Sequence, residues 1–163
     1  VAAVQNIPGR MEPVANQRGL TILVDYAHKP EALEKALLSV RNLTPGRVVT
    51  VFGCGGERDR SKRPVMGSIA IRLSDQAIVT SDNPRGEDPL SIIDEIVSGI
   101  EDRTHLIVEP DRASAIRLGL KDLNPGDCLL IAGKGHETYQ IIGGAKLPFD
   151  DKAVVQEHLK EFA

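Results

Sequence analysis

Short apolar runs that alternate with helix-like segments constrain the fold of this chain more than any other feature. Five runs of strand length occur, at residues 20–26 (LTILVDY), 47–53 (RVVTVFG), 76–80 (QAIVT), 105–109 (HLIVE) and 128–133 (CLLIAG). Most are continuously apolar rather than alternating in polarity, which is typical of strands buried on both faces. Such strands belong to parallel sheets that are covered by helices on both sides.

Helical patterns fill the intervals between these runs. They cover residues 30–43, 64–73, 89–100 and 111–124, and a further helix is predicted over 150–163 after a short strand at 138–144. The first three begin with proline, whose fixed φ suits the first turn of a helix. The chain is therefore predicted to form an α/β fold: a Rossmann-like, mostly parallel sheet with helices on both faces and one antiparallel edge strand.

Size and charge exclude several classes of protein. A chain of 163 residues, 41% of them hydrophobic, suits one globular domain. Its 20 basic and 23 acidic residues give a net charge of -3, so neither nucleic acid nor an anionic membrane is an expected partner. No apolar run has the length of a membrane span, and Cys54 and Cys128 lie in or beside apolar runs as reduced thiols commonly do. A cytoplasmic location is expected.

The N-terminal segment has a different character. Residues 1–18 contain Pro8, Gly9 and Pro13 and resemble an entry segment that arrives from another part of a protein. The chain also begins with Val1 rather than Met. It is therefore expected to be a piece of a longer polypeptide.

Polar residues follow each predicted strand. Ligands of parallel α/β sheets bind outside the carboxyl ends of the strands, so these segments are candidate binding loops. For any single residue a solvated loop charge is the simpler interpretation, but their concentration at one edge favours a site for a ligand that carries both charges. The residues are Asp25, His28, Arg58, Asp59, Arg60, Lys62, Arg63, Asp82, Asn83, Arg85, Lys134, His136 and Glu137.

Known phosphate-binding motifs do not fit the glycine-rich loops. A dinucleotide fingerprint G-x-G-x-x-G would need glycine where Arg58 stands, and a P-loop ending at GK would need a hydroxyl where Gly135 stands. Glycines at 53, 55 and 56 allow the backbone to approach a ligand or another loop, and a simple bend before the next helix remains an alternative. The four histidines show no ligand spacing, so no metal site and no catalytic residue is predicted.

Five segments together resemble the C-terminal domain of the Mur ligases. They are PGRME (8–12), VDYAHKPEAL (24–33), FGCGGERDRSKRPVMG (52–67), SDNPRGEDP (81–89) and AGKGHETYQ (132–140), and they span nearly the whole chain in order. The resemblance implies that residues 1–163 are the amino-acid-binding domain of an ATP-dependent ligase of peptidoglycan synthesis. The domains that bind the UDP-sugar, ATP and Mg²⁺ would lie outside this chain, so the isolated domain is expected to be inactive and to hold no cofactor by itself.

The tetrapeptide DNPR specifies the implied substrate further. In the family it marks enzymes that add meso-diaminopimelate to the UDP-N-acetylmuramoyl dipeptide. Arg85 would grip the distal carboxylate that L-lysine lacks, through two parallel charge-assisted hydrogen bonds, while Glu137 and the Gly133 carbonyl would accept from the distal ammonium. The residues implied for this substrate are Arg58, Asp82, Asn83, Pro84, Arg85, Gly133 and Glu137.

A second set of positions matches those that face the nucleotide in the family. The resemblance implies that Asp25 reaches the ribose of ATP, that Arg10 reaches its phosphates and that His28 belongs to the same region. Taken from the residues alone, Arg10 is a surface charge, Asp25 a strand-end turn residue and His28 a helix-entry residue.

Three other functions remain open. A non-catalytic small-molecule-binding module could use the same loops, and a ligase of the same family could add L-lysine. A nucleotide-dependent methyltransferase or dehydrogenase rests only on a strand followed by GCGG, and the missing third glycine argues against it.

Overall fold

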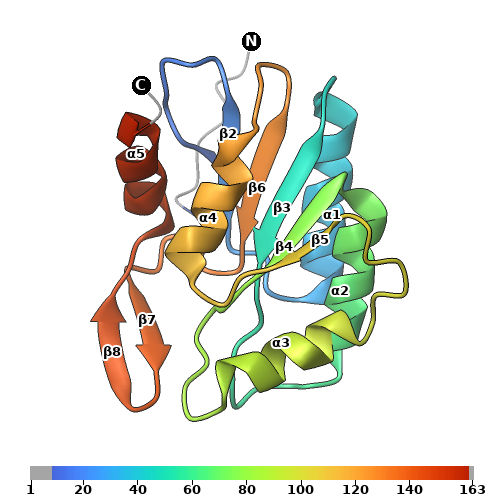
Figure 1. Ribbon diagram of the computed structural model, residues 1–163, viewed down its shortest axis with the longest axis vertical. Coiled ribbons are helices and arrows are strands. Elements are labelled where there is room, and N and C mark those ends of the chain that lie inside the picture. Colours follow the sequence, from blue (N-terminus) through green and yellow to red (C-terminus); the bar gives the residue numbers. More distant parts are fainter. Residues whose placement is uncertain (1–8, 162–163) are drawn as a thin grey trace.

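A six-stranded sheet forms the centre of the molecule, in the computed structural model that describes residues 9–161 (Figure 1). Its strand order is β1-β2-β6-β3-β4-β5, and β1 alone runs antiparallel to its neighbour, β2. An antiparallel edge strand is present as predicted, but it is β1, which lies in the segment interpreted from the sequence as an entry segment, where no strand was predicted. The strands are β1 (Glu12–Pro13), β2 (Thr21–Asp25), β3 (Val48–Phe52), β4 (Gln76–Val79), β5 (Leu106–Val108) and β6 (Cys128–Ala132).

Within residues 9–161, five helices cover the two faces of this sheet, as the sequence predicts. The chain moves from β2 through β3 and β4 to β5 with α1, α2 and α3 packed on one face, then returns through α4 to place β6 between β2 and β3. The return explains why α4, followed by α5, covers the opposite face (Figure 1). The helices are α1 (Pro30–Leu43), α2 (Lys62–Leu73), α3 (Pro89–Val97), α4 (Arg112–Lys121) and α5 (Asp151–Glu161).

Several helix ends differ from the prediction. Helices α3 and α4 end at Val97 and Lys121, earlier than the predicted ends at residues 100 and 124, and α2 begins at Lys62 rather than at Pro64. Residues 162–163 of the predicted last helix, and residues 1–8 of the N-terminal segment, lie outside the described residues. Among the helices of residues 9–161, none is long and apolar enough to cross a membrane.

Strand β6 shows why the apolar runs are continuous. Cys128, Leu130 and Ala132 pack into the core shared with α1, α2 and α3, whereas Leu129 and Ile131 pack into the core shared with α4 and α5. All five side chains are buried. Both faces of the strand therefore need apolar residues, as the unbroken sequence pattern indicates.

A small hairpin stands apart from the main sheet. Strand β7 (Tyr139–Ile142) pairs with β8 (Ala145–Pro148) in a separate two-stranded sheet (Figure 1). The strand predicted at 138–144 is therefore confirmed as β7, while β8 gave no signal because all four of its residues are exposed. The hairpin is tied to the loop after β4, since the Arg85 amide donates to the Ile141 carbonyl oxygen at 2.9 Å.

Candidate functional site

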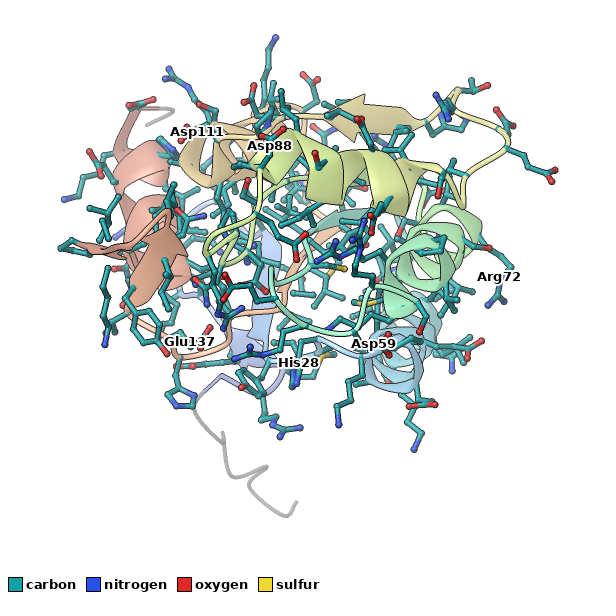
Figure 2. All side chains as sticks on the ribbon, turned by 90° about the horizontal axis from the view of Figure 1, so that it is seen from below. His28, Asp59, Arg72, Asp88, Asp111 and Glu137 are labelled. Atoms are coloured by element: carbon teal, nitrogen blue, oxygen red, sulfur yellow. The ribbon has the colours of Figure 1, made fainter. Side chains whose placement is uncertain are left out.

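A cleft of about 800 Å³ lies at the carboxyl ends of the strands; we refer to it as the first cleft. Segments that follow β2, β3, β4 and β6 form its walls, as the parallel sheet predicts. Figure 2 looks onto this end, with His28 between Glu137 and Asp59 in the view. Of the seven residues implied for the amino acid, Pro84 alone is not part of the lining; the six that line the cleft are Arg58, Asp82, Asn83, Arg85, Gly133 and Glu137.

The glycine-rich loop after β3 packs directly on the loop after β4. A Cβ added to Gly56 would lie 1.8 Å from the Pro84 carbonyl oxygen, and one added to Gly53 would lie 2.3 Å from the Thr80 carbonyl oxygen. The Gly56 amide also donates to the Asn83 carbonyl oxygen at 2.8 Å. Of the readings left open for GCGG, approach to another loop therefore accounts for Gly53 and Gly56.

Asn83 holds three segments together. Its side-chain oxygen accepts hydrogen bonds from Lys134 Nζ at 3.0 Å and from the Ile141 amide at 3.0 Å. The residue is 4% exposed. Its oxygen is therefore occupied in fixing the loops after β4 and β6 and strand β7 relative to one another.

Arg85 has a left-handed backbone, with a φ of 55°. This conformation is uncommon for a residue other than glycine, and here the hairpin holds it through the bond to Ile141. The guanidinium donates through Nη1 to the carbonyl oxygens of Gly56 at 2.9 Å and Asn83 at 3.4 Å. Within the described residues no hydrogen bond is formed by Nε or Nη2, so these groups can donate to a ligand.

Lys134 is one of the charged residues whose burial the sequence did not predict. It was expected on the polar edge without a role, yet its side chain is fully buried. Its ammonium lies 3.6 Å from Asp82 Oδ1 and 3.6 Å from Glu137 Oε1. Burial lowers the pKa of Lys134, and the adjacent Asp82 carboxylate opposes that effect.

Arg112 joins the ends of two strands from inside the protein. It forms two hydrogen bonds to the Asp151 carboxylate, at 2.8 and 2.9 Å, and both side chains are completely buried. It also donates to the carbonyl oxygens of Ser81 at 3.1 Å and Ala132 at 3.2 Å. These carbonyls precede Asp82 and Gly133, so Arg112 fixes the starting points of both loops.

Arg63 performs a similar task on the other side of the first cleft. The sequence placed it on the solvated edge, but its side chain is fully buried, and it donates to both oxygens of Glu87 at 3.0 Å. It also donates to Glu95 at 2.9 Å and to the Gly55 carbonyl oxygen at 3.0 Å. The hydrogen bond from Arg63 lowers the pKa of Glu87 to about 2.

A second cleft, of about 490 Å³, lies beside the first, between the N-terminal segment and α1. Arg10 and Asp25 line it, whereas His28 lines the first cleft. The buried Asp25 carboxylate accepts from the Met11 amide and the Ala27 amide, both at 2.8 Å. Asp25 therefore has a structural role, to bind these two backbone amides, whether or not it also binds a ligand.

The remaining candidate groups have ordinary surroundings. Arg10 is exposed, with its guanidinium carbon 5.7 Å from the centre of the Tyr26 ring, and His28 Nδ1 lies 2.9 Å from the Tyr26 carbonyl oxygen. Burial raises the pKa of Cys54 to about 12, so this thiol stays protonated. Among residues 9–161 no group of three or more His, Cys, Asp or Glu side chains could hold a metal ion.

Comparison with known proteins decides the family. Residues 9–135 match the family described as "Mur ligase, glutamate ligase domain". The chain belongs to the Mur ligase family. The predicted resemblance is thereby confirmed, and the described sheet and helices confirm the predicted α/β fold.

Two curated relatives of this Mur ligase chain carry the name UDP-N-acetylmuramoyl-L-alanyl-D-glutamate--2,6-diaminopimelate ligase. The protein from Thermosynechococcus vestitus is 53% identical over 157 residues, which are 95% of this chain and 32% of that protein. The protein from Solibacter usitatus is 48% identical over 164 residues, 99% of this chain and 33% of that protein. The chain thus spans about a third of the length of the curated relatives it matches.

Solved structures agree with this assignment to the Mur ligases. A structure with the same name as the curated relatives has a TM-score of 0.89 at 39% identity and covers 98% of this chain and 33% of that one. The bifunctional folylpolyglutamate synthase/dihydrofolate synthase from Yersinia pestis has a TM-score of 0.61 at 15% identity, over 97% of this chain and 32% of that one. The second similarity shows a shared fold only.

Proposed function

We propose that this chain is the amino-acid-binding domain of an ATP-dependent ligase that joins meso-diaminopimelate to UDP-N-acetylmuramoyl-L-alanyl-D-glutamate. One observation carries the proposal: Arg85, with Nε and Nη2 available, lines the same cleft as Asp82 and Glu137. The distal end of meso-diaminopimelate bears one carboxylate and one ammonium. A cleft that offers a guanidinium beside two carboxylates has the complementary charges.

Each lining group has a role in this proposal. Arg85 pairs with the distal carboxylate, and its planar guanidinium suits a two-point contact. Asp82 and Glu137 face the distal ammonium together with the carbonyl oxygen of Gly133. The φ of Gly133 is 117°. Arg58 is exposed at the mouth of the cleft and is suited to the other carboxylate of the amino acid. Asn83 and Pro84 support the turn rather than the ligand.

The second cleft is the proposed site of contact with ATP. Arg10 and Lys35 are exposed there, which suits them to phosphate groups. The Asp25 carboxylate already accepts two hydrogen bonds from backbone amides, so it is suited to the ribose only through its remaining lone pairs. In the complete ligase ATP would convert the acceptor carboxylate into an acyl phosphate, and the amine of the amino acid would displace the phosphate to form the amide. As the family resemblance implies, Mg²⁺ is assigned in this proposal to parts of the ligase outside this chain.

Replacement of Arg85 by alanine in the full-length ligase tests the proposal. We expect the wild-type enzyme to prefer meso-diaminopimelate to L-lysine, and Arg85→Ala to lose that preference by roughly 10²- to 10⁴-fold, because a site built to bind a polar group rejects analogues that lack it. The measurement is kcat/KM for both amino acids. The control is Arg72→Ala, which removes an exposed arginine whose partner is Glu34 on α1.

Two results would contradict the proposal. A wild-type enzyme that used L-lysine as well as meso-diaminopimelate would argue for a ligase of different specificity. An Arg85→Ala enzyme that kept the original preference would show that another residue recognises the carboxylate.

A further inference from the structure

Lys134 lies beneath the first cleft, between two carboxylates that come from different loops. Its fully buried ammonium is the same distance, 3.6 Å, from Asp82 and from Glu137. Both carboxylates line the cleft, whereas Lys134 itself does not. The lysine can therefore influence a ligand through the charges on either side of it, without direct contact.

The geometry points to Lys134 as a specificity-determining residue. We propose that its positive charge balances one of the two carboxylates, so that the four groups Lys134, Arg85, Asp82 and Glu137 together carry no net charge where the distal end of the amino acid binds. A neutral group of this kind accepts the distal end of a diamino dicarboxylic acid, which carries both charges. The same neutral group gives no additional attraction to the distal end of a diamino monocarboxylic acid such as lysine, because that end carries only a positive charge. This inference rests on the proposed function.

Contacts around the ammonium explain why a lysine suits this position. The Lys134 ammonium donates to Asn83 Oδ1 at 3.0 Å and lies 5.6 Å from the centre of the Tyr139 ring. A compact point charge can meet these partners at once, whereas the planar fork of arginine imposes its own directions. Burial strengthens the effect on the neighbouring carboxylates, because charges interact more strongly away from water.

The test replaces Lys134 by methionine in the full-length ligase. The expected result is that the ratio of kcat/KM for meso-diaminopimelate to kcat/KM for L-lysine falls by about tenfold, through a higher KM for diaminopimelate and a lower or unchanged KM for lysine. A purely structural role for Lys134 would instead weaken both substrates equally. Equal losses, or an unchanged ratio, would overturn the inference.

Glu137→Gln provides the opposite change in charge and does not leave a buried hole. Because it removes one negative charge from the lining, we expect the same ratio to rise, although both substrates lose an acceptor for their ammonium. In the double variant Lys134→Met/Glu137→Gln the ratio should return to within about threefold of the wild-type value. A ratio that falls in Glu137→Gln would overturn the inference even if Lys134→Met proved too unstable to assay.

The wild-type enzyme separates the two proposals. If it shows no preference for meso-diaminopimelate, the proposed function fails and this inference fails with it. If it shows the preference and the variants do not move it as stated, the inference alone is wrong.

Discussion

The two clefts differ in how their walls are held. In the first cleft the loops after β3, β4 and β6 are fastened by the fully buried side chains of Arg63, Arg112 and Lys134. In the second cleft the basic lining residues Arg10 and Lys35 are exposed, and the buried Asp25 carboxylate accepts from the Met11 and Ala27 amides. The first cleft therefore has a shape that this domain sets by its own contacts. The second has an open side, which suits a ligand held jointly with another surface.

Of the changes predicted for the first cleft, the loss of Arg112 should lower the free energy of unfolding most. Replacing it by methionine leaves the fully buried Asp151 carboxylate without its partner and frees the carbonyls of Ser81 and Ala132. Breaking a buried ion pair from one side costs about 3 to 5 kcal/mol, so we expect the free energy of unfolding to fall by that amount. Urea denaturation of the domain measures it.

Arg117→Met is the matched control for Arg112→Met. It lies on the same helix, and its ion pair with Glu161 is exposed at both ends. We expect a loss below about 1 kcal/mol. Equal losses in the free energy of unfolding for the two variants would show that the buried ion pair of Arg112 stabilises the first cleft no more than an exposed ion pair does.

Gly56→Ala should affect the first cleft alone. The added Cβ would lie 1.8 Å from the Pro84 carbonyl oxygen, and a backbone atom cannot swing aside as a flexible side chain can. We expect a loss of about 1 to 3 kcal/mol in the free energy of unfolding. In NMR spectra the amides of residues 82, 83, 85 and 86 should shift, while those of residues 32, 35, 36 and 39, which line the second cleft, stay in place.

Gly144→Ala provides the control for that substitution. Gly144 has no described atom within 4 Å of an added Cβ and does not require a positive φ. It should leave both the stability and the amides of residues 82, 83, 85 and 86 unchanged. Shifts at residues 32, 35, 36 and 39 in Gly56→Ala would mean that the two clefts are mechanically coupled.

Much of this arrangement could be predicted from the sequence. Continuous apolar runs follow directly from burial on both faces of a strand, and the rule that ligands bind at the carboxyl ends of parallel strands brought Asp82, Arg85 and Glu137 together. Both inferences use only local pattern and general topology. They did not require knowledge of which side chains touch.

Burial of the charged residues could not be predicted in this way. Arg112 is buried because Asp151 is its partner, and that partner lies 39 residues further along the chain. Arg63 and Lys134 likewise look like solvated loop charges until the loops are folded. The left-handed backbone of Arg85 depends on the β7–β8 hairpin, which pairs across the fold rather than along the sequence.

Low pH should destabilise the walls of the first cleft through protonation of Glu87. This effect should be smaller than the effects of Arg112→Met and Gly56→Ala. The pKa of Glu87 is lowered in the folded protein from an ordinary value of 4.5 to about 2, chiefly by the hydrogen bond from Arg63. The ionised carboxylate therefore stabilises the fold above pH 4.5, and this contribution is lost as the pH falls toward 2. The difference in free energy of unfolding between wild type and Glu87→Gln should be constant above pH 5 and should shrink between about pH 4.5 and 2. A difference that stays constant across that range would show that the bond between Arg63 and Glu87 does not fasten the loop in solution.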